Sequence, residues 1–140
     1  MEYNGKYLIV ADMGELKCYQ VKWIEETDRY HLELQYDLDY IEGRQTPGET
    51  LSDDRGRFRH ESGEDHGVEH ESQQRLIHHI ANDISVFLAD IPEKSCYLAF
   101  PAKHHNELIS ALSKTAQNAL AKNIAADLVK CPIEDLLSHF

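Results

Sequence analysis

Three of the nine histidines lie in the polar stretch 55–72, which ends in the pattern H-x-x-E-H at 66–70. On a helix this spacing would bring His66 and His70 onto one face, as in zinc proteases of the inverted pattern. Such a site needs a third ligand, and no downstream residue is marked as one by its spacing. We therefore interpret the stretch as a solvated loop, with metal binding by His60, His66 and His70 as the alternative, and expect no cofactor.

The same stretch could grip phosphate. Arg55, Arg57 and Arg59 alternate with other residues, Gly56 separates the first two, and Arg44 lies upstream. Arginine offers a planar donor fork that suits phosphate, and glycine lets a backbone approach closely. Acidic residues surround these arginines: Asp53, Asp54, Glu61, Glu64 and Asp65. A self-neutralised, solvated loop is therefore the competing interpretation.

Metal-dependent nuclease chemistry would need acids from the sheet and the first long helix. Asp12 and Asp83 are at suitable places, but the expected strand at 95–100 contains no acid, so the set is incomplete. We predict that Asp12 is a turn carboxylate. His78 and His79 are adjacent on an expected helix and point in different directions, so they predict a polar face.

The cysteines predict no disulfide framework and no thiolate zinc site. Cys18, Cys96 and Cys131 are an odd number, lie far apart and show no C-x-x-C spacing. We expect reduced thiols, with Cys18 and Cys96 buried within strands.

Length and charge limit the possible partners. A chain of 140 residues is expected to form one domain, 1–140. Residues 1–91 hold 9 Lys or Arg against 20 Asp or Glu, whereas residues 92–140 hold 5 of each. This acidity argues against broad nucleic-acid binding, so only a local basic patch could contact RNA. No export signal or membrane span is evident, which predicts a cytoplasmic protein without a membrane partner.

Apolar patterning predicts a mixed α/β fold. Short apolar or alternating runs indicate strands at 6–12, 15–24 and 29–40, joined by short turns into an antiparallel meander. Alternation in the third run predicts one inner face carrying the residues Tyr30, Leu32, Leu34, Tyr36, Leu38 and Tyr40. A flexible polar loop at about 43–70 follows.

The second half predicts the order α-β-α-β-α. It comprises a helix from about 69 that Pro92 ends, a buried strand at 95–100, a helix opened by Pro101, a strand at 124–129 and a terminal helix after Pro132. Right-handed crossovers would make the last two strands parallel to their neighbours. We expect a mixed five-stranded sheet, similar to the ribonuclease-H-like plan. An exposed edge strand of the meander could pair two copies, and the oligomeric state is left open.

Four segments together resemble a known family. They are YLIVADMGELKCYQV at 7–21, LSDDRGRF at 51–58, YLAFPAKHHNELISAL at 97–112 and AADLVKCPIEDLLSHF at 125–140. In this order the chain resembles the bacterial host attachment protein family, which is similar to the catalytic middle domain of archaeal and eukaryotic peptide-chain release factors. The resemblance implies a third strand that leads through a long loop into a long helix.

In release factors that loop carries a glycine-glycine-glutamine tip, which positions water on the peptidyl-tRNA ester. This chain has Gly43-Arg44-Gln45, one glycine short and in a different position relative to the helix. Gln45 is therefore only a weak catalytic candidate, and we lean against an enzyme.

Three functions remain open. The first is a cytoplasmic accessory protein that contacts the ribosome or tRNA through Arg44, Arg55, Arg57 and Arg59, with Gly56 shaping the tip. The second is an ester hydrolase acting on peptidyl-tRNA through the same loop. The third is a protein-interaction module without RNA contact, which the acidic first 91 residues favour.

Overall fold

The computed structural model describes the backbone of residues 3–40 and 62–140, and the side chains of 3–40 and 71–140. Its centre is a mixed five-stranded sheet, as the sequence predicts, and the strand order is β3-β2-β1-β4-β5. β1 pairs antiparallel with β2 and parallel with β4, and β5 runs parallel to β4. The strands are β1 Tyr7–Ala11, β2 Glu15–Ile24, β3 Arg29–Asp39, β4 Cys96–Phe100 and β5 Leu120–Ala125.

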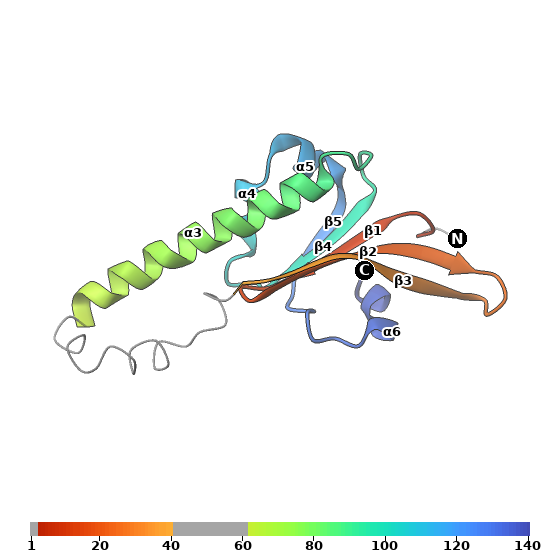
Figure 1. Cartoon of the computed structure of the whole chain (residues 1–140), viewed down its shortest axis with the longest axis horizontal. Coiled ribbons are helices and arrows are strands. Elements are labelled where there is room, and N and C mark those ends of the chain that lie inside the picture. The colour runs from red at the N-terminus through yellow and green to blue at the C-terminus, as the bar shows by residue number, and fades with distance from the viewer. Residues whose placement is uncertain (1–2, 41–61) are drawn as a thin grey trace.

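Helices cover both faces of this sheet (Figure 1). The long α3, Ser62–Leu88, packs with α4, His105–Ala111, and α5, Lys114–Ala119, on one face. The short α6, Ile133–Leu136, lies on the other face and continues into a 3-10 turn, Leu137–His139.

The central strand β1 is buried on both sides, which explains its unbroken apolar run. Ile9 packs in the layer under α3, whereas Leu8 and Val10 pack in the layer under α6. All three side chains are fully buried. Burial of this apolar area is the main stabilising contribution of the sheet.

A β-bulge in β3 corrects the prediction of one inner face. Cys18 pairs with Tyr36 and Tyr19 pairs with Leu34, so Gln35 is an extra residue between two pairs. Because a bulge shifts the alternation by one residue, Leu32 lies in the α6 layer whereas Tyr40 lies in the α3 layer.

Exposure along β3 also differs from the prediction. Leu34 is 50% exposed and Tyr36 is 40% exposed, although the Tyr36 ring stacks on Phe87 of α3 with centroids 6.3 Å apart. Both residues lie beside the bulge on β3, which is an edge strand of the described sheet, so fewer neighbouring side chains pack against them.

The helix α3 begins at Ser62, earlier than the predicted start near residue 69. Residues 62–70 of the predicted 43–70 loop are therefore helical, and the remainder, 43–61, lies outside the described residues. The sequence pattern missed the start because residues 71–75 are exposed and Leu76 is the first buried residue of the described side chains. A helical stretch without a buried face shows no apolar periodicity.

The predicted second helix is two helices, and the last strand comes earlier than expected. Leu112 adopts an extended conformation, with φ −68° and ψ 149°, and Ser113 caps α5 by accepting a hydrogen bond from the Ala116 N–H. Leu120, expected on the helix, pairs with Cys96 as the first residue of β5. The predicted strand at 124–129 was therefore placed four residues too late.

Candidate functional site

The residues predicted to grip phosphate lie outside the described part of the chain, together with the weak catalytic candidate and the first histidine of the metal alternative. They are Arg44, Gln45, Arg55, Gly56, Arg57, Arg59 and His60. Their roles stay predictions.

The H-x-x-E-H pattern lies inside α3, not at or before the start of a helix as expected. His66 and His70 therefore occupy consecutive turns, although their side chains are not among those described. Within 3–40 and 71–140, no group of three His, Cys, Asp or Glu side chains is placed to hold a metal ion. A metal role for His60, His66 and His70 also stays a prediction.

A hydrogen-bonded cluster fixes the point where the chain leaves β3. The Tyr40 hydroxyl donates to Oδ2 of Asp83 on α3 at 2.7 Å, and its backbone N–H donates to the Gly14 carbonyl at 2.9 Å. His79 approaches the same carboxylate, with its Nε2 3.5 Å from Oδ2. Its ring meets the Tyr40 ring edge-on, with centroids 5.7 Å apart.

Tyr40 is an anchor and not an acid or a nucleophile. Burial raises the pKa of its hydroxyl, and the hydrogen bond to Asp83 raises that pKa further. The phenol therefore stays protonated and holds the carboxylate. The sequence marked His79 only as part of a polar face, because the 43-residue separation of Tyr40 and Asp83 hides their contact.

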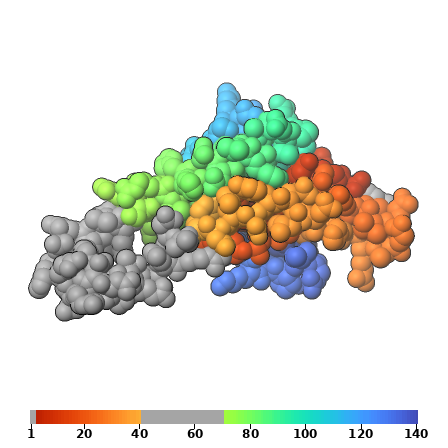
Figure 2. Space-filling model, in the orientation of Figure 1, coloured from red at the N-terminus to blue at the C-terminus, as the bar shows by residue number. Residues whose placement is uncertain are grey.

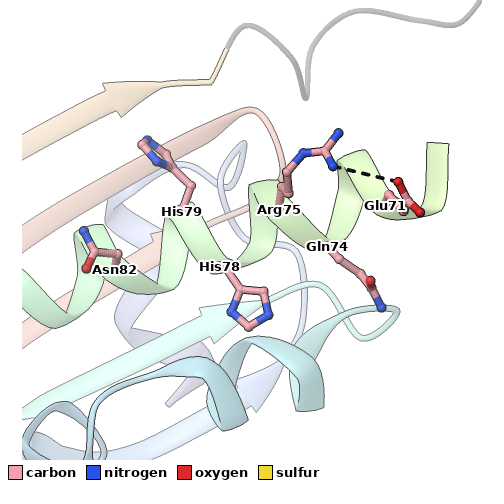
Figure 3. A pocket seen from close by; sticks show the side chains of 6 residues that line it. All are labelled: Glu71, Gln74, Arg75, His78, His79 and Asn82. Carbon is pink, nitrogen blue, oxygen red and sulfur yellow. Dashed lines mark ion pairs between the residues drawn. The ribbon is translucent and has the colours of Figure 1, made fainter. Parts of the chain in front are cut away.

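Polar side chains cover α3 beside this cluster (Figure 3). They border an open depression and are Glu71, Gln74, Arg75, His78, His79 and Asn82. Arg75 and His79 point to one side of the helix, whereas Gln74 and His78 point to the other. The Arg75 guanidinium lies 4.0 Å from the Glu71 carboxylate. Diverging side chains on an open surface can contact a large partner, but they do not enclose a small substrate.

The other candidate groups have structural roles. Oδ1 of Asp12 accepts a hydrogen bond from the Gly14 N–H at 2.7 Å, which confirms the predicted turn carboxylate. Burial raises the pKa of the Cys18 thiol to about 12 and also raises the pKa of Cys96. The pKa of Cys131 is raised too, although its Sγ lies 3.7 Å from Nε2 of His139. These thiols are poor nucleophiles because the reactive form is the thiolate.

The fold is that of a mixed α/β protein. The depression described above is an open surface along a polar helix and not an enclosed cavity. The chain belongs to the family described as protein required for attachment to host cells, whose model matches residues 7–140. This confirms the host attachment resemblance, while the likeness to release-factor middle domains stays a prediction.

No curated protein matches the chain, and no solved structure matches it either. The strand order is observed, whereas the resemblance to the ribonuclease-H-like plan stays a prediction. Among the described residues, every helix is too short or too polar to cross a lipid bilayer.

Proposed function

We propose that this protein is a cytoplasmic, release-factor-like accessory protein that contacts phosphates of ribosomal RNA or tRNA through residues 43–70. In this proposal Arg44, Arg55, Arg57 and Arg59 supply the phosphate contacts. The chain order supports it, because a meander leads through this segment into a long helix, as the release-factor resemblance implies.

The placement of the segment's two ends carries the proposal. Tyr40 is held by its bonds to Gly14 and Asp83, so one end is anchored to the sheet and to α3. At the other end, α3 extends past the sheet (Figure 1). The part from Ser62 to Arg75 precedes Leu76, the first of the described side chains of α3 to be buried. It is about 20 Å long at about 1.5 Å per residue.

The end of β3 and the start of α3, which this segment connects, both lie on the side of the molecule away from the N-terminus (Figure 1). A binding segment that connects two such separate points suits a large, extended surface, such as folded RNA, better than a small substrate. Catalysis is not part of the proposal, because among the described residues Tyr40 stays protonated and the cysteine thiols are poor nucleophiles.

A protein partner is the second candidate, and charge favours it. Between residues 62 and 75 the helix holds four acids, Glu64, Asp65, Glu69 and Glu71, and a single arginine. Negative charge repels phosphate, so this part of α3 would oppose RNA binding unless the arginines of 43–61 outweigh it.

Co-sedimentation with ribosomes separates the two candidates. Wild type is compared with a variant carrying Arg55→Ala, Arg57→Ala and Arg59→Ala, at low and moderate salt. The matched control replaces three exposed lysines by alanine, which changes the net charge equally: Lys103, Lys114 and Lys130.

Salt-sensitive binding that the arginine variant loses and the lysine control keeps would support phosphate contacts. Each lost contact is expected to lower the slope of log K against log salt by about 1. Absence of wild-type binding at low salt would refute the RNA proposal and favour a protein partner. If binding holds, release of peptide from peptidyl-tRNA, lost on Gln45→Ala, would establish the hydrolase.

A further inference from the structure

β3 forms one edge of the sheet within residues 3–40 and 62–140. Figure 2 shows its atoms exposed along the front of the molecule. An edge strand presents backbone N–H and C=O groups that can pair with another strand. Along β3, apolar or aromatic residues alternate with polar ones. Five of the polar residues are charged or are histidine: Arg29, His31, Glu33, Asp37 and Asp39.

The bulge at Gln35 limits which part of β3 can pair with a copy of itself. Ahead of it, Leu32 faces the α6 layer, whereas beyond it Leu38 faces the α3 layer. Two copies related by a two-fold axis perpendicular to the sheet keep equivalent faces on the same side, so opposed residues must face alike. The stretch 29–35 meets this condition over its whole length and lies on one side of the distortion between Gln35 and Tyr36.

Gln35 belongs to this stretch because it lies on the same face as Glu33. Its Nε2 donates to Oε1 of Glu33 at 3.0 Å. Glu33 in turn accepts from Nζ of Lys22 at 2.9 Å, and Lys22 pairs with His31 in the β2–β3 ladder. Arg29, His31, Glu33 and Gln35 thus form one polar row on the α3 side of the strand.

We propose that β3 of one chain pairs antiparallel with β3 of a second copy, with the two-fold axis at Leu32. In this register His31 lies opposite Glu33 of the second copy, and Arg29 lies opposite its Gln35. On the other face Tyr30 covers the Leu34 of the second copy, whose side chain is 50% exposed in the monomer. Apolar cross-strand pairs favour association, and no two like charges lie opposite each other in this register.

Charge and length select this register over its neighbours. An axis at Glu33 would set two glutamates directly opposite each other, and like charges in that position destabilise a pair. An axis at His31 would shorten the face-matched stretch to 29–33 and leave Leu34 uncovered. The Leu32 register avoids both faults.

The contact is short, so the dimer is expected to be weak. Seven residues of one strand bury less than the roughly 1,200 Å² of a standard interface. We expect a dissociation constant on the order of 10 μM. The surface is separate from residues 43–70, so the dimer does not depend on the RNA proposal.

Sedimentation equilibrium of the full chain over a range of concentrations tests association. His31→Glu places an acid opposite Glu33 at two symmetric points, and the dissociation constant is expected to rise about tenfold. Asn106→Glu, at an exposed position on α4, makes the same charge change as the matched control and is expected to leave it unchanged. Circular dichroism checks that both variants are folded.

Disulfide trapping tests the register. Arg29→Cys and Gln35→Cys are made separately in a Cys131→Ser background, then oxidised alone and as an equimolar mixture. Residue 29 lies opposite residue 35 of the second copy, whereas two copies of residue 29, or of residue 35, are about 20 Å apart. A disulfide dimer is therefore expected only in the mixture.

Concentration-dependent dimerisation with a disulfide only in the mixture supports the proposal. A chain that stays monomeric up to ~1 mM overturns it. A dimer that gives no 29–35 disulfide, or that His31→Glu and Asn106→Glu weaken equally, overturns the pairing of β3.

Discussion

The hydroxyl of Tyr40 is the most informative single group to remove. Tyr40→Phe keeps the ring, which is 4% exposed, and deletes only the 2.7 Å hydrogen bond to the Asp83 carboxylate. That bond ties the end of β3 to α3 across 43 residues of chain. Its loss should lower the free energy of unfolding without creating a large cavity.

The size of the effect follows from the charge and exposure of the acceptor. Hydrogen bonds to charged groups contribute about 1.5–3 kcal/mol. The Asp83 side chain is 18% exposed and His79 lies beside it, so water and the imidazole can replace part of the lost bond. We expect a loss of about 2 kcal/mol near neutral pH.

The raised pKa of Tyr40 adds a dependence on pH. The phenol stays neutral in the folded protein, whereas in the unfolded chain it ionises above its ordinary pKa of about 10. Unfolding then releases a proton, so wild-type stability falls by up to about 1.4 kcal/mol per pH unit above pH 10. The Tyr40→Phe variant lacks this loss, and an initial difference of about 2 kcal/mol should vanish near pH ~11.5.

Urea unfolding followed by far-UV circular dichroism at neutral pH and at several pH values above 10 measures both effects. Tyr36→Phe is the control, because the Tyr36 ring is 40% exposed, and a change below about 0.5 kcal/mol is expected. A Tyr40→Phe effect below about 0.5 kcal/mol would refute the role of the hydrogen bond. A difference that stays constant above pH 10 would refute the linkage to Tyr40 ionisation.

Three further outcomes follow from buried and capping groups. In native protein a thiol reagent should leave Cys18 and Cys96 unmodified and react slowly with the partly exposed Cys131, with all three reacting after denaturation; rapid native modification of Cys18 or Cys96 would contradict their burial. Ser113→Ala removes the cap of α5 and should lower the free energy of unfolding by about 1 kcal/mol in denaturant titration, with Ser113→Thr as the conservative control. Ile80→Ala leaves a cavity at a fully buried position of α3 and should lower the free energy of unfolding by about 2–5 kcal/mol. A loss below about 1 kcal/mol would contradict the packing of α3 on the sheet.

Much of the candidate surface was beyond sequence reasoning. The sequence assigned His79 to a polar helix face and considered Asp83 only as an acid of an incomplete metal site. Their contact with Tyr40 depends on how α3 crosses the sheet. The opposite holds for Asp12, whose turn role rests on a contact only two residues along the chain and was predicted correctly. A hydrogen bond between residues close in the sequence can be predicted from a short sequence pattern, whereas a contact between distant residues cannot.

The number of strands and their mixed parallel and antiparallel pairing were predicted from patterns within the chain. Short turns forced β1, β2 and β3 into a meander, and helical crossovers forced β4 and β5 to run parallel, because chain length and handedness allow little else. The bulge at Gln35, the early start of α3 and the break at Leu112 were decided only in three dimensions. Each of these features depends on which other strand or helix packs against the residues concerned. The pattern of apolar residues along one strand or helix does not identify that neighbour.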